Sequence, residues 1–146
     1  TGLKLDDYLP YRLSVASNAV SGLIARAYED RFGLTIPQWR LICVLAEDVA
    51  LSQVDIVART GMDKVTVSRA AQGLTKRRLI SRSEHQRDGR SHLLALTQEG
   101  AHLYSEIAPL ALAYEAALIA GLAPTEVATL KRLLTRLQGA ALALGG

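Results

Sequence analysis

One segment of the 146-residue sequence, residues 63–80, limits more than any other what this chain can fold into. At 100° per residue, its pattern predicts a helix with two unlike faces. One face carries the small apolar residues Val67, Ala70, Ala71 and Leu74. The opposite face carries Val65, Ser68, Arg69, Gln72 and Lys76. Such a helix packs on a core with one side and presents hydrogen-bonding groups on the other, which suits the DNA major groove.

The residues before this helix predict a shorter helix that a tight turn joins to it. Ser52 and Asp55 have the spacing of a capping box at the start of the shorter helix. The residues expected to face inward from it are Val54, Val57 and Ala58. Residues 60–62, with a central glycine, predict the turn, and Asp63 predicts the cap of the longer helix. Short helix, glycine turn and longer helix together predict a helix-turn-helix.

After Leu79 the period of the sequence changes from 3.6 to 2, which predicts strands. Residues 80–85 alternate, residues 86–90 have turn chemistry, and residues 92–96 return as a second strand. This hairpin predicts a wing whose basic loop suits the negative potential of the DNA minor groove. We expect Arg87 and Arg90 to enter that groove.

Charge and composition agree with a folded protein that binds nucleic acid. Residues 52–97 hold nine basic and four acidic residues, although the net charge of the chain is only +3. This concentration suits phosphate neutralisation, and the alternative is an ordinary solvated face. A hydrophobic content of 49% excludes disorder, and no apolar run approaches the roughly 18 residues of a membrane span. We therefore predict a cytoplasmic protein that needs no membrane.

Both ends of the chain carry heptad-like apolar patterns, with residues spaced alternately three and four apart. The first helix is predicted at about 10–30 and carries Leu9, Leu13, Ala16, Val20, Leu23 and Ala27. The last begins near Pro124 and carries Val127, Leu130, Leu134, Leu137, Ala141 and Leu144. Between them, a capping box at Thr35 and Gln38 starts a helix to about Asp48, and Thr97 starts one to about Ala120. The two patterns pair within one chain or across two, and their apolar character favours a homodimer.

Chemistry assigns a role to each polar residue of the longer helix. Arg69 suits guanine, Gln72 suits adenine, and Val65 suits a thymine methyl group. The residues that suit phosphate, and so fix register without selecting bases, are Lys64, Thr66, Ser68 and Lys76. For each of them the alternative is an exposed side chain that never reaches DNA.

On these residues the chain resembles the MarR family of winged helix-turn-helix transcriptional regulators over essentially its whole length. The match is densest at residues 34–45, 51–82 and 86–100. The resemblance implies one domain over 1–146, mainly α with a small β-hairpin, with dimerisation helices at about 8–31 and 98–144 around a reader at about 35–97. It implies a homodimer that binds a pseudo-palindromic DNA operator, usually as a repressor. Release by a small phenolic or carboxylate effector, or by thiol oxidation, is also typical of the family.

The resemblance also carries residue roles. It supports Thr66, Ser68 and Arg69 as reading residues, and Arg87 and Arg90 as wing arginines that Asp88 orients. The residues it implies for dimerisation are Leu9, Leu13, Ala16, Val127, Leu130, Leu134, Leu137 and Ala141. Two departures are His85, where the family usually has an acidic residue, and Arg78, where it usually has glycine. A left-handed backbone at Arg78 costs roughly 1 kcal/mol.

Other function classes have less support. A winged-helix module that binds protein or nonspecific DNA is the alternative to a regulator. No catalytic triad, carboxylate pair or phosphate loop is present at usable spacing, so we predict no enzyme. The three histidines are too scattered for a zinc site, and we predict no metal or cofactor. Cys43 is predicted to be a small buried apolar residue, and the aromatic residues are predicted to pack in the core and at interfaces. The sequence names no effector-pocket residues.

Overall fold

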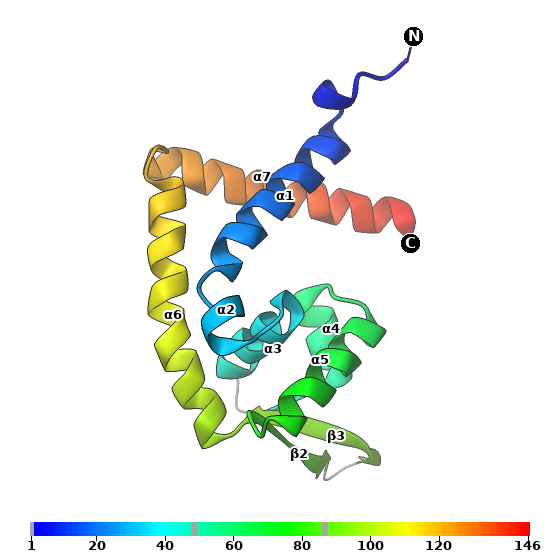
Figure 1. Cartoon of the computed structure of the whole chain (residues 1–146). Coiled ribbons are helices and arrows are strands. Elements are labelled where there is room, and N and C mark those ends of the chain that lie inside the picture. The colour runs from blue at the N-terminus through cyan, green and yellow to red at the C-terminus, as the bar shows by residue number, and fades with distance from the viewer. Residues whose placement is uncertain (1, 48–49, 86–87) are drawn as a thin grey trace. The chain divides into compact units, whose positions relative to one another are not determined.

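The structure is a computed structural model that describes residues 2–47, 50–85 and 88–146 (Figure 1). In chain order its elements are a short 3-10 helix η1 (Leu5–Asp7), α1 (Leu9–Ala25), α2 (Glu29–Phe32), α3 (Ile36–Glu47), β1 (Leu51–Ser52), α4 (Gln53–Thr60), α5 (Lys64–Lys76), β2 (Ile80–His85), β3 (Asp88–Leu96), α6 (Gln98–Ile119) and α7 (Pro124–Gly145). The predicted class, mainly α with a small β-hairpin, is confirmed. Internal contacts divide the chain into two units, Thr1–Ala111 and Leu112–Gly146, which we describe separately.

The helix-turn-helix and the hairpin form the core of the first unit. α3, α4 and α5 pack on one another, and β2 packs against α5. The most deeply buried side chains come from several of these elements, namely Leu41, Ile42, Ile56, Val67, Leu74, Ile80 and Leu94. Figure 1 shows the β2–β3 hairpin beside α5. One compact core therefore fixes the longer helix and the wing relative to each other.

Within the part of the chain that the structure describes, the sheet has three strands, in the order β1-β3-β2. The predicted hairpin is present as β2 and β3, with Ile80 opposite Leu96 and Arg82 opposite Leu94. The register shifts between Glu84 and His85. β1 was not predicted, because two residues are too few to show a period of two.

The prediction that Val54 and Ala58 face inward from α4 was wrong. Val54 is 78% exposed and Ala58 is also exposed, whereas Ile56 is completely buried and Val57 is half-buried. The helix begins at Gln53 after the predicted Ser52 cap, so the cap itself was placed correctly. Ile56 is the bulkiest apolar side chain of α4, and its burial removes the most apolar surface from water.

The first long helix was predicted as continuous, but it is broken. α1 ends at Ala25, and α2 begins at Glu29. Tyr28 lies in the break, is only 2% exposed, and stacks on Trp39 with ring centroids 5.4 Å apart. Trp39 in turn stacks on Tyr104 of α6 at 5.8 Å. This aromatic stack agrees with the prediction of packing, and the break allows Tyr28 to reach it.

A glycine ends α2, and caps at the predicted Thr35 and Thr97 start α3 and α6. Gly33 ends α2 with a left-handed φ of 67°. The Gln38 N–H donates to Thr35 Oγ1 at 3.2 Å, and the Thr35 N–H donates to Gln38 Oε1 at 3.0 Å, which is the predicted capping box of α3. Thr97 Oγ1 accepts from the Gly100 N–H at 3.0 Å at the start of α6.

The second unit contains the end of α6 and all of α7. Pro124 occupies the first turn of α7, where it lacks only an N–H that the helix leaves unpaired. No residue of α7 is buried, although its sequence is largely apolar. In the described chain, no single helix is long and apolar enough to cross a membrane; α6 and α7 meet the criteria of length and composition only together, as a pair bent by 105°.

The first turn of α6 rests directly on the backbone that leaves α5. A Cβ added to Gly100 would overlap the carbonyl oxygen of Leu79, which itself accepts from the Thr97 N–H at 3.1 Å. Glycine is required here by close backbone approach, since its φ is not in the left-handed region.

We predict that Gly100→Ala destabilises the protein by about 1–3 kcal/mol, because the added methyl group must displace backbone. The measurement is thermal or urea unfolding followed by circular dichroism. Gly22→Ala is the matched control, since α1 leaves open space around Gly22. It should be neutral or stabilise the helix by up to about 1 kcal/mol. Equal stability of the two variants would contradict the close approach.

Candidate nucleic-acid interface

The two helices of the helix-turn-helix are held by caps at both ends of the turn. Ser52 Oγ accepts from the Asp55 N–H at 3.1 Å, and Asp55 Oδ2 accepts from the Ser52 N–H at 3.2 Å. Gly61 ends α4 with a left-handed φ of 71°. Asp63 then caps α5, accepting from the Thr66 N–H and the Thr66 hydroxyl, both at 2.8 Å. These bonds fix where α5 begins and therefore which side chains it presents.

α5 has the two faces that its sequence predicts. The predicted inner residues are all buried, namely Val67, Ala70, Ala71 and Leu74. Of the residues of α5 predicted to contact DNA, five are exposed, namely Lys64, Val65, Arg69, Gln72 and Lys76. Ser68 and Thr66 are half-buried, and the Thr66 hydroxyl already donates to Asp63. Thr66 therefore has to rotate before it donates to a phosphate.

Arg78, in the turn that leaves α5, is the position where the resembling family usually has glycine, and its backbone is left-handed. Arg78 has a φ of 62°, the only positive value among the described non-glycine residues. The Leu79 N–H donates to the Leu74 carbonyl at 3.0 Å, which closes the end of the helix. The Thr97 hydroxyl donates to the Arg78 carbonyl at 2.7 Å. These hydrogen bonds offset the roughly 1 kcal/mol that a non-glycine residue costs here.

The wing is described in its strands but not at its tip. Arg87 lies outside the described residues, as do the side chains of His85, Asp88 and Arg90. The backbones of Asp88 and Arg90 belong to β3. Their predicted roles in the minor groove stay predictions.

Not all of the basic residues in this region face outward for DNA. The Arg77 guanidinium donates to the carbonyls of Phe32 at 2.9 Å and Gly33 at 3.2 Å. Arg59 forms an ion pair with Glu47 at 2.7 Å. Charge counting alone could not separate these two arginines from those available to phosphate, because their partners lie far away in sequence.

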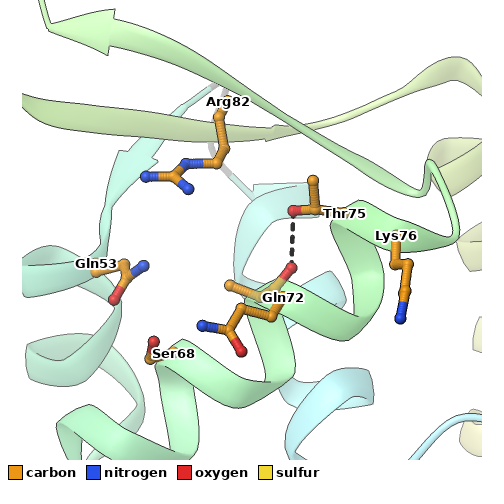
Figure 2. A pocket seen from close by; sticks show the side chains of 7 residues that line it. Gln53, Ser68, Gln72, Thr75, Lys76 and Arg82 are labelled. Atoms are coloured by element: carbon orange, nitrogen blue, oxygen red, sulfur yellow. Dashed lines mark hydrogen bonds between the residues drawn. The ribbon is translucent and has the colours of Figure 1, made fainter.

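A hollow of about 580 Å³ lies between α5, the start of α4 and strand β2. Its polar lining consists of Gln53, Ser68, Gln72, Thr75, Lys76 and Arg82 (Figure 2). Three of these, Ser68, Gln72 and Lys76, were predicted to contact DNA. Gln53 and Arg82 were not, although the alternation that puts Arg82 on the same sheet face as Ile80 is a signal for the latter.

The residues predicted for dimerisation lie along α1 and α7. Val127 is half-buried, whereas the other seven predicted residues are exposed in the single chain, namely Leu9, Leu13, Ala16, Leu130, Leu134, Leu137 and Ala141. Exposed apolar side chains in such number on two helices are unusual for the surface of a monomeric protein.

Cys43, the one cysteine of the chain, lies partly buried on α3. Burial, with a smaller contribution from Glu47, raises the pKa of the Cys43 thiol to about 12. The thiol is therefore protonated at neutral pH and weakly nucleophilic. Within residues 2–47, 50–85 and 88–146, no three His, Cys, Asp or Glu side chains are grouped to hold a metal ion.

We predict that Asp63→Ala lowers the melting temperature, because α5 loses its cap. The backbone and hydroxyl hydrogen bonds from Thr66 lower the pKa of Asp63. The advantage of the carboxylate over Asp63→Asn is therefore complete above the ordinary aspartate pKa of about 4 and is lost as pH falls through the lower folded value. Melting curves of wild type and Asp63→Asn across acidic pH measure it.

Asp7→Ala removes the same charge from an exposed residue of η1 and should leave the melting temperature unchanged. A difference between wild type and Asp63→Asn that does not vary with pH would show that the Asp63 carboxylate does not stabilise α5 by its charge.

Comparison with known proteins places this geometry among DNA-binding regulators. The family model described as the MarR family matches residues 32–91. No curated protein is detectably similar to the chain in sequence.

Several solved structures are similar to the chain. A probable transcriptional regulator from Pseudomonas aeruginosa is 32% identical with a TM-score of 0.80, covering 92% of this chain and 99% of that one. BpsR from Bordetella bronchiseptica, whose DNA binding is regulated by 6-hydroxynicotinic acid, is 27% identical with a TM-score of 0.86, covering 94% and 98%. A mutant MarR from E. coli complexed with operator DNA is 22% identical with a TM-score of 0.80, covering 88% and 92%, and shares the fold.

Proposed function

Because this chain belongs to the MarR family, we propose that it is a homodimeric, sequence-specific DNA-binding transcriptional repressor. One observation carries the proposal: α5 buries its apolar face and leaves its basic and amide side chains exposed beside a β-hairpin. This arrangement fits a helix in the major groove with a wing in the adjacent minor groove. The operator-bound relative with the same fold supports the same use of the fold.

The roles of the side chains follow from their donors and acceptors. Arg69 is exposed and contacts guanine O6 and N7, and Gln72 contacts adenine. Val65, 58% exposed, contacts a thymine methyl group. The residues that hold phosphates are Lys64, Thr66, Ser68 and Lys76. Arg87 and Arg90 enter the minor groove, with Asp88 orienting them.

A homodimer explains the apolar surfaces of the two terminal helices. Leu13 of α1 is 37% exposed, and Leu134 and Leu137 of α7 are 45% and 40% exposed. A second copy of the chain covers such surfaces and presents two reading helices to one DNA duplex. Two linked readers also provide the specificity that a single reading helix seldom has.

We further propose that a small aromatic carboxylate or phenol releases the repressor from DNA. The effector of BpsR, 6-hydroxynicotinic acid, is an aromatic carboxylate and supports this chemical class. Thiol oxidation receives no support, because the Cys43 thiol stays protonated at neutral pH. A regulator must reach the DNA inside the cell, so we expect the protein to act in the cytoplasm.

Selection of bound fragments from random genomic DNA tests the function. We expect an enriched, pseudo-palindromic sequence whose half-sites are centred about 10 base pairs apart. The affinity for that sequence should exceed the affinity for random DNA by a large ratio that persists as salt rises. A ratio near one would instead support a nonspecific DNA-binding module, and no DNA binding at all would support a protein-binding winged helix.

We predict that Arg69→Ala abolishes preference at one base pair of each half-site, because a bidentate contact discriminates by about 1–3 kcal/mol. The measurement is affinity for the selected operator and for each single-base variant of it. Lys64→Ala is the control: it removes the same charge from α5, but should weaken binding equally to every variant. Unchanged preference in Arg69→Ala would reassign Arg69 to phosphate.

A further inference from the structure

Polar residues from outside the reading helix α5 also line the hollow between α5 and the wing. It is bordered by Lys76 of α5, Arg82 of β2 and Gln53 of α4, together with Ser68 and Gln72. Figure 2 shows Arg82 and Gln53 extending toward the side of α5 that carries Ser68 and Gln72. Three separate elements therefore direct polar groups into one space.

The lining of the hollow suits an anion. Lys76 and Arg82 are cations, and Gln53, Ser68 and Gln72 supply neutral hydrogen-bond donors. Among the described residues, no aspartate or glutamate lines it. Such a lining attracts a phosphate and holds it with charge-assisted hydrogen bonds.

Arg82 is the cation of this lining to which no other role has been assigned. It lies on β2 opposite Leu94 and on the same sheet face as the buried Ile80, so the strand turns it toward α5. The guanidinium forms no ion pair or hydrogen bond with the described residues, unlike the guanidinium of Arg77. Its nearest acidic neighbour on that face, Glu84, does not line the hollow.

The geometry of duplex DNA supplies an anion at this place. A helix in the major groove and a wing in the neighbouring minor groove have one sugar-phosphate backbone between them. That backbone must pass between α5 and the hairpin, which is where the hollow lies. No other groups of the duplex in that position carry full negative charge.

We propose that the hollow receives the DNA backbone that separates the two grooves, and that Arg82, assisted by Gln53, is a phosphate-binding residue of this protein. The proposal rests on the proposed function in requiring DNA, but not in requiring a particular operator. Arg82 then adds affinity on every sequence and selects none.

The test compares Arg82→Ala, Arg82→Lys and wild type on the selected operator and on a short random-sequence duplex, at several salt concentrations. Each phosphate contact contributes about 0.9 to the slope of log affinity against log salt. Arg82→Ala should therefore lower affinity for both duplexes by the same factor, about tenfold per reader at roughly 0.1 M salt, and should flatten the slope by about one per reader. Arg82→Lys keeps the charge and should retain most of the affinity and the slope.

Arg26→Ala, which removes an exposed arginine at the end of α1 that does not line the hollow, is the matched control and should change neither slope nor ratio. Melting curves establish that each variant is folded. An unchanged slope in folded Arg82→Ala overturns the proposal. A loss confined to the operator also overturns it, because Arg82 would then read a base.

Different results would refute the proposed function and the proposed role of Arg82. A wild-type protein without operator preference refutes sequence-specific regulation, while the salt slope on the random duplex still decides the role of Arg82. A protein that binds neither duplex refutes both.

Discussion

Burial of the small-residue face of α5 against α3 and α4 is the contact on which the DNA-facing side of the molecule depends. Val67 and Leu74 are completely buried, and each such side chain contributes about 1.5–3 kcal/mol to stability. Gly73 leaves room for a side chain of α3, since a Cβ there would come within 2.6 Å of Nε2 of Gln38. Gln38 is itself fixed by the Thr35 capping box. The orientation of the outer face of α5 therefore follows from how its inner face packs.

Local chemistry made much of this region predictable from the sequence. The caps at Ser52 and Asp63 use hydrogen bonds within three residues, and the two faces of α5 use a period of 3.6. The left-handed Arg78 was anticipated only from the family resemblance, as the position where glycine is usual. The helix-turn-helix and the hairpin followed from these short-range signals, and the fold class followed from them together with the family resemblance.

The features that the sequence did not predict depend on contacts between distant residues. The break before α2 depends on the stacking of Tyr28 on Trp39, and the burial of Ile56 in preference to Val54 depends on how α4 packs. The hydrogen bonds of Arg77 to Phe32 and Gly33 span more than forty residues. In the candidate site, α5 could be predicted residue by residue, whereas Gln53 and Arg82 join it only because folding brings α4 and β2 to its side.

The close backbone approach at Gly100 limits how the first turn of α6 can move relative to the hairpin. Where helices meet through side chains, rotamer changes absorb small displacements, but here backbone rests on backbone at Leu79. The first turn of α6 is therefore in direct backbone contact with the residues that precede β2. Hydrogen bonds from the Thr97 hydroxyl to the Arg78 carbonyl and from the Thr97 N–H to the Leu79 carbonyl hold the two segments together. We therefore expect the first turn of α6 and the start of the hairpin to move together as one rigid body.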